Sequence, residues 1–153
     1  MSKSMKTGIN FPSFDSPFLE EVALSLRKRS KAIKNRAVRF TCERVRELRD
    51  SGDYELMEMQ IELHRTPRIQ FSFKLWSDRW LWIDIRQPSK RGWLFDWQHD
   101  GRVGDTEPSG IVESIITTLK IPYSDDVLVV RSKLDNLWAK VALGGPRTAQ
   151  TLP

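Results

Sequence analysis

The chain has 153 residues, of which 39% are hydrophobic and 29% charged, a composition typical of a folded globular protein. Its net charge of +5 is concentrated at the start, because residues 1–50 carry 12 Lys and Arg against 6 Asp and Glu. The single cysteine, Cys42, excludes an intramolecular disulfide and a multi-cysteine metal site. The first residues lack the apolar run of a signal peptide, and no 18-residue apolar stretch occurs, so we expect a soluble, cytoplasmic protein without a membrane partner.

The sequence predicts one domain between two flexible ends. Residues 1–10 are polar and are expected to be flexible. Residues 11–143 are expected to form a single α+β domain, and no linker or internal repeat divides them. Residues 144–153 are expected to form a flexible C-terminal tail.

A long helical segment is predicted first. Ser16 suits the N-cap and Pro17 suits the first helical position. Residues 18–51 contain no Gly or Pro, and apolar residues recur there at helical spacing, with a gap near Ser30. The segment is therefore expected to be one long helix or two helices broken near Ser30.

Six basic residues cluster within this helical segment. Nucleic-acid affinity arises largely from counterion release when Lys and Arg meet phosphates, so an unmixed basic run predicts a nucleic-acid contact. Charge runs are also common on solvated helix faces, and that alternative stays open. The candidate nucleic-acid-binding residues are Arg27, Lys28, Arg29, Lys31, Lys34 and Arg36.

Four segments then alternate apolar and polar residues with a period of two, as half-buried β-strands do. Short links with turn chemistry join them, and His99-Asp100-Gly101 is predicted to close the run with a turn. Short links between alternating strands indicate an antiparallel meander with one buried face. The predicted strands are 57–64, 69–75, 81–86 and 93–98.

The second hairpin decides which way the tryptophans point. A three-residue loop at 77–79 keeps Leu75 opposite Leu81 on the apolar side. A two-residue loop would place Asp84 among the aromatic residues, and burying such an unpaired charge costs several kcal/mol, roughly. We therefore expect Trp76 to face Trp80 and Lys74 to face Trp82, all on the otherwise polar side of the sheet.

Two further helices are predicted after the sheet. One follows Pro108 and ends at Ile121-Pro122, and the other is capped by Ser124 and ends at Gly144-Gly145. Residues 127–130 are rich in β-branched side chains and could form a fifth strand instead. The predicted fold is α+β: a four-stranded antiparallel meander, or a five-stranded one, packed by an N-terminal long or broken helix and two C-terminal helices.

Catalytic motifs are missing from the sequence. It contains no Gly-rich phosphate loop, no nucleophile elbow and no paired-histidine zinc motif, so neither a metal nor a cofactor is expected. A metal-dependent nuclease remains an alternative, because four carboxylates share the polar face of the sheet. Arg86 stands where such a site would prefer lysine, and exposed sheet faces carry carboxylates without catalysis. The four carboxylates are those of Glu58, Glu62, Asp84 and Asp96.

The aromatic residues of the polar face give the leading functional hypothesis. Tryptophan and arginine are enriched at binding hot spots, and aromatic residues beside cations can also stack on unpaired bases. A helix or the Phe11–Phe14 segment could instead cover them. The candidate partner-binding residues are Trp76, Trp80, Trp82, Lys74 and Arg86.

We expect a non-enzymatic small binding protein that docks a macromolecular partner, in an inhibitor, immunity-type, chaperone or adaptor role. The partner is expected to be a protein. The alternatives are nucleic-acid binding through residues 27–36 and, third, the nuclease. The sequence assigns no oligomeric state.

Overall fold

The computed structural model describes residues 13–63, 68–90 and 92–142, and the chain there forms an α+β fold with one five-stranded antiparallel sheet. Each strand pairs with the next along the chain, in the order β1-β2-β3-β4-β5, which confirms the predicted meander. The predicted flexible ends and the 65–67 link lie outside the described residues. The elements are α2 (Pro17–Lys34), β1 (Ala37–Arg49), β2 (Gly52–Leu63), β3 (Gln70–Trp76), β4 (Trp80–Ser89), β5 (Gly92–Arg102), α3 (Pro108–Lys120) and α4 (Val127–Ala139).

Helix α2 begins where the sequence predicts. The Ser16 hydroxyl accepts a hydrogen bond from the Leu19 N–H (3.3 Å), and Pro17 occupies the first turn. Glu55 of β2 anchors this helix end, because its buried carboxylate accepts hydrogen bonds from the N–H groups of Asp15 (3.0 Å) and Ser16 (3.1 Å). The start of α2 is thus held against the sheet.

The predicted continuation of this helix to residue 51 is wrong. Helix α2 ends at Lys34, and β1 replaces the second half of the predicted helix. The physical reason is a change of period, because Val38, Phe40 and Cys42 alternate with polar residues. Phe40 and Cys42 are buried in the core, and a turn before Gly52 (φ 138°) joins β1 to β2.

The register of the second hairpin is confirmed. Lys74 pairs with Trp82 and Leu75 with Leu81. The Arg79 N–H donates to the Trp76 carbonyl (2.9 Å), and Arg79 adopts a positive φ of 74°. A left-handed residue at the end of a three-residue loop gives the twist that such hairpins require.

The end of the sheet differs from the prediction. Residues 99–101 form no turn, because β5 continues to Arg102. Asp100 pairs with Trp82 and Gly101 with Leu81, so pairing with β4 overrides the local turn preference.

The two C-terminal helices are confirmed. Helix α3 starts at Pro108 and ends before Pro122, as predicted. Asp126 caps α4 in place of Ser124, since its carboxylate accepts from the Leu128 N–H (2.8 Å). Residues 127–130 are helical, so the fifth strand lies at 37–49 instead, and α4 ends at Ala139 rather than at Gly144.

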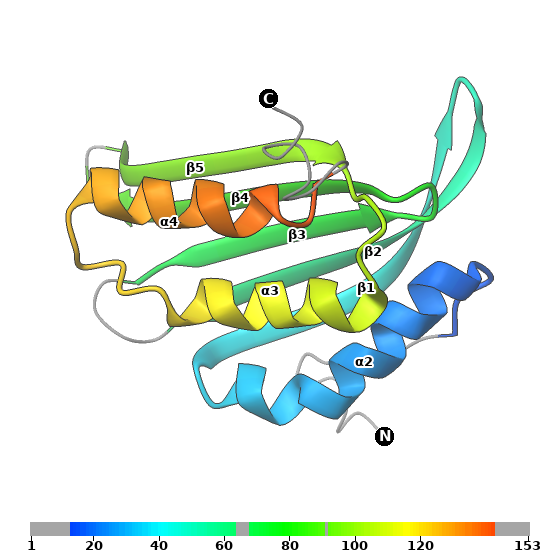
Figure 1. The fold of residues 1–153 in the computed structure, drawn as a ribbon, viewed down its shortest axis with the longest axis horizontal. Helices are drawn as coiled ribbons and strands as arrows, with labels where there is room; N and C mark the ends of the chain where they lie inside the picture. The colour runs from blue at the N-terminus through cyan, green and yellow to red at the C-terminus, as the bar shows by residue number, and fades with distance from the viewer. Residues whose placement is uncertain (1–12, 64–67, 91, 143–153) are drawn as a thin grey trace, which may run out of the picture.

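The three helices described all lie on one face of the sheet, as Figure 1 shows. The predicted core residues of β3 and β4 are buried between the two layers. Aromatic rings fill the middle of this layer, with Phe73 stacked on Phe71 and tilted against Trp138, each at 6.3 Å between centroids. The predicted core residues are Phe71, Phe73, Leu75, Leu81, Ile83 and Ile85.

Candidate functional site

The sheet face turned away from the helices is the open face. Its side chains come from alternate positions of all five strands, because successive residues of a strand point to opposite sides. The open face divides into an aromatic half near the β3–β4 hairpin and a charged half near the other end of β3.

The aromatic half contains the tryptophan patch, which we define as Val45, Leu56, Trp76, Trp80 and Trp82. One cross-strand row joins Val45, Leu56 and Trp76, and the next row places Trp82 beside Lys74. Leu56 is only 3% exposed, although it points away from the helices. Trp80 is 36% exposed, and Trp76 and Trp82 are partly exposed. Apolar surface therefore gathers on the side of the sheet that the described helices leave uncovered.

Two of the three indoles are held in place by carboxylates. The Trp76 Nε1–H donates to Glu47 Oε1 (2.7 Å), and the Trp80 Nε1–H donates to Asp100. The guanidinium of Arg49 lies 3.8 Å from the Tyr54 ring centroid and 5.6 Å from that of Trp76. These contacts fix the orientation of the rings, so this part of the surface is ordered before any partner arrives.

Trp82 is the least constrained of the three. The Lys74 ammonium lies 5.3 Å from its ring centroid and 3.9 Å from Glu58 Oε2. Within the part of the chain that the structure describes, the Trp82 indole N–H has no hydrogen-bond partner. A partly exposed ring with a free donor and an adjacent cation can accept both apolar and polar contacts.

Arg86 lies on the open face but apart from the tryptophan patch. It is two cross-strand rows from Trp82, or about 13 Å along β4 at 3.3 Å per residue. Its Nε lies 2.8 Å from Asp84 Oδ2 and 3.8 Å from Asp96 Oδ1. The structure therefore brings Lys74 to the three tryptophans and ties Arg86 into the charged half.

The carboxylates of the nuclease hypothesis also face cations. Glu58 pairs with Lys74, Glu62 with Arg68, and Asp84 with Arg86. Among the described residues, no three His, Cys, Asp or Glu side chains gather as metal ligands would. The charged half has the pairing pattern of a structural ion network.

The six basic residues predicted at 27–36 do not form one continuous helical surface. Arg27, Lys28, Lys31 and Lys34 are exposed on α2, whereas Arg29 pairs with Glu113 of α3. Arg36 follows the end of the helix, in the turn before β1. The basic residues therefore continue from the helix towards the first strand.

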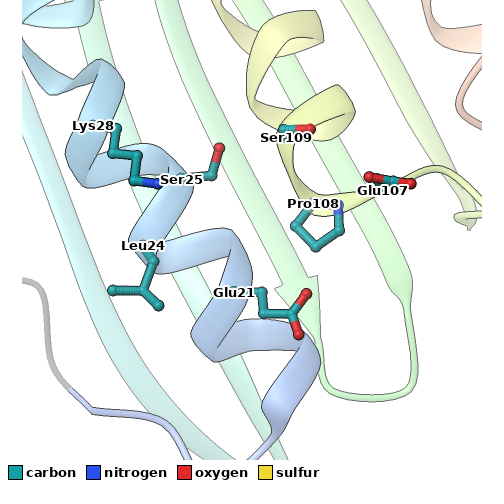
Figure 2. Close-up of a pocket in the computed structure, with 7 residues that line it drawn as sticks. All are labelled: Glu21, Leu24, Ser25, Lys28, Glu107, Pro108 and Ser109. Carbon is teal, nitrogen blue, oxygen red and sulfur yellow. The ribbon is translucent and has the colours of Figure 1, made fainter.

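A hollow of about 360 Å³ lies between α2 and the start of α3, and Figure 2 shows its lining. Carboxylates of Glu21 and Glu107 and the ammonium of Lys28 border it, so its charge is mixed. This lining selects no class of ligand.

Two titratable side chains have pKa values that their surroundings shift. Burial, together with Glu43, raises the pKa of the Cys42 thiol to about 12, so the thiolate needed for nucleophilic attack does not form near neutral pH. Burial lowers the pKa of His99, an effect that Asp100 opposes, and the imidazole stacks on Trp97 at 6.2 Å. His64 lies outside the described residues.

Sequence reasoning missed part of the tryptophan patch and its supports. Val45, Glu47 and Arg49 were assigned to a helix, and Leu56 lies just before the predicted start of its strand. The alternation from Val38 to Glu43 was the signal that could have revealed β1.

No family model, curated protein or solved structure matches the chain. In the described ranges, no helix combines the length and the apolar character that a membrane span requires.

Proposed function

We propose that this protein is a non-enzymatic binding protein that docks a protein partner on the tryptophan patch, in an inhibitor, immunity-type, chaperone or adaptor role. The observation that carries the proposal is Trp82, partly exposed and beside Lys74 on the sheet face away from the helices. Tryptophan side chains that become buried when a partner docks are typical hot spots of protein interfaces. A contiguous exposed apolar patch on a small domain marks such an interaction site.

The charge of the open face favours a protein partner over a polyanion. Carboxylates outnumber basic groups there by seven to six, so the face as a whole offers a phosphate backbone no excess of positive charge. A partner with apolar and polar groups needs no such excess. The carboxylates are Glu43, Glu47, Glu58, Glu62, Asp84, Asp96 and Asp100, and the basic groups are Arg39, Arg49, Arg68, Lys74, Arg86 and Arg102.

The test uses Trp82→Ala as the discriminating variant. Wild type, Trp82→Ala and Gln60→Ala are immobilised and compared as baits in an extract of the source cells. Gln60 is the control because it is exposed on the same face, outside the patch. The captured partner is then purified, and its affinity for each variant is measured by calorimetry.

We expect Trp82→Ala to weaken binding by more than about 2 kcal/mol, the range of a hot spot, with little change in melting temperature. Gln60→Ala should bind as the wild type does. A partner that binds Trp82→Ala and wild type equally would show that its site lies elsewhere. Destabilisation of Trp82→Ala by roughly 3–5 kcal/mol would show that Trp82 belongs to the core.

A further inference from the structure

A second surface carries a charge excess of its own. No acidic residue occurs between Glu21 and Glu43, a stretch that includes most of α2 and the start of β1. Seven basic residues lie in that stretch: Arg27, Lys28, Arg29, Lys31, Lys34, Arg36 and Arg39.

Five of these residues lie on either side of the connection between α2 and β1, which Figure 1 shows, with Arg39 on the open-face side of β1. We define the basic corner as Lys28, Lys31, Lys34, Arg36 and Arg39. All but Arg36, which is partly exposed, are exposed to solvent. Within the described residues, none of the five takes part in an ion pair.

The second half of β1 makes a clear contrast. Arg44, Arg46 and Arg49 all pair with carboxylates, including Asp15 and Asp78. Among the described residues, the arginines at one end of the strand are thus paired with carboxylates, whereas the basic corner at the other end has no carboxylate partner.

Neighbouring elements do not cancel the charge of the basic corner. Glu113 of α3 is paired with Arg29, and Glu62, which lies across from Arg39 in the sheet, is paired with Arg68. Glu21 and Glu107 border only Lys28, across the hollow of Figure 2. An excess of positive charge therefore remains at Lys31, Lys34, Arg36 and Arg39.

We propose that the basic corner binds the phosphate backbone of duplex nucleic acid. Duplex DNA carries one negative charge per about 1.7 Å of its axis, so several neighbouring cations meet several phosphates at once. Lys31 and Lys34 are about 4.5 Å apart along the helix axis, at 1.5 Å per residue. Arg36 follows in the turn, and Arg39 lies beyond it on the open-face side of the outer strand β1. The binding is sequence-independent and driven by counterion release.

Two other polyanionic partners fit the surface less well. Single-stranded nucleic acid is held by stacking on exposed aromatic rings, and Phe40, the aromatic residue next to the corner, is buried. A membrane-surface helix inserts its apolar face into lipid, but Leu26 and Ile33 of α2 are buried in the protein core. Binding to the backbone of duplex nucleic acid requires neither an exposed aromatic ring nor an exposed apolar helix face.

The experiment measures binding of a labelled 20-base-pair DNA duplex by fluorescence anisotropy from 25 to 200 mM salt. The test variant is K31Q/K34Q/R39Q, in which all three residues are exposed. The control variant is R102Q/K133Q/K140Q, which removes the same charge from exposed residues elsewhere: an arginine of β5, a lysine of α4 and the lysine that follows α4. Each phosphate contact contributes about 0.9 to the slope of log affinity against log salt.

We expect wild type and control to share a steep slope, and the test variant to lose up to about 2.7 of that slope together with most of its low-salt affinity. W82A should bind the duplex as the wild type does, so this result is separate from the proposed protein-binding function. Four results would overturn the proposal: no retention of duplex at 25 mM salt, equal losses in test and control variants, tighter binding to a single strand of the same length, or preference for anionic vesicles over the duplex.

Discussion

The tryptophans whose side chains the structure describes have different roles that residue type alone does not distinguish. Trp138 is buried among the helices and donates its indole N–H to Thr118 (3.0 Å), while Trp97 is buried under α4 and donates to Asp135 (2.9 Å). Trp76 and Trp82 project from the other side of the same sheet. Position in the pleat, set by the hairpin register, separates the core residues from the proposed binding residues.

Phe73 tests the facing of the sheet. Phe73→Ala would leave a cavity between Phe71 and Trp138, and we expect it to lower the free energy of unfolding by about 3–5 kcal/mol in urea titration. Gln60→Ala, on the open face, should stay within about 0.5 kcal/mol of wild type. Glu62 is not a suitable neutral control, although it lies on the same face, because it is buried and paired with Arg68. A larger loss for Gln60→Ala than for Phe73→Ala would reverse the assignment of the two faces.

Cys42 provides a chemical test of β1. Because burial raises the pKa of its thiol from 9.0 to about 12, the native protein should react with a thiol-specific disulfide reagent at pH 8 far more slowly than the unfolded protein. The unfolded chain releases the thiol proton above about pH 9 and the folded chain does not, so this group makes the fold less stable as pH rises from 9 towards 12. Equal reaction rates with and without denaturant would show that Cys42 is accessible.

At the scale of elements, the sequence predicted those features that local chemistry decides. Ser16 and Pro17 predicted the start of α2, and the cost of burying Asp84 in an apolar layer predicted the β3–β4 register. The sequence failed where tertiary pairing decides the structure. His99 to Gly101 has the composition of a turn, but β4 extends alongside it and keeps it in the sheet.

Strand β1 was missed for a related reason. Its residues lack Gly and Pro and have mixed charges, as a solvated helix does, and only six of them alternate clearly. The burial of Phe40 and Cys42 against β2 and the helices makes this segment a strand. These contacts join residues far apart in the sequence, so the local pattern of β1 does not reveal them. The tryptophan patch was consequently predicted without the β1 side chains that support it.

Glu55 tests the connection between helix and sheet. Glu55→Ala removes the acceptor for the Asp15 and Ser16 N–H groups and the partner of Arg44, whose Nε lies 2.5 Å from Glu55 Oε2. We expect a loss of about 1–3 kcal/mol in the free energy of unfolding, because the part-buried N–H groups of Asp15 and Ser16 and the guanidinium of Arg44 lose a buried acceptor. The matched variant Glu58→Ala, which removes only a partly exposed ion pair, should lose less than about 1 kcal/mol. Equal losses in the two variants would mean that Glu55 does not anchor α2.

At the scale of the molecule, the fold is asymmetric, since the described helices cover one face of the sheet and not the other (Figure 1). The alternation in the four predicted strands indicated one buried and one polar face of the sheet. It did not indicate whether another element covers the polar face. The β1–β2 hairpin also extends beyond the helices in Figure 1, and Leu48 at its tip is 83% exposed.

Hydrogen exchange can measure this asymmetry. We expect amides of residues 46–53 to exchange at least about tenfold faster than those of 71–75 and 81–85, because strands β3 and β4 each pair on both sides beneath the helices. Mass spectrometry of peptic fragments gives both rates in one experiment. Uniform protection along all five strands would contradict the exposed position of the hairpin.

The position of β1 at the border of the sheet gives its charges another consequence. An outer strand carries a row of backbone groups that can template growth of the sheet with further copies of the chain, and natural proteins discourage this with charged side chains. Glu43, Arg44, Arg46, Glu47 and Arg49 stand along the thirteen residues of β1 in this role. The residues that resemble a solvated helix in the sequence are therefore the kind of side chain that discourages such growth at an outer strand.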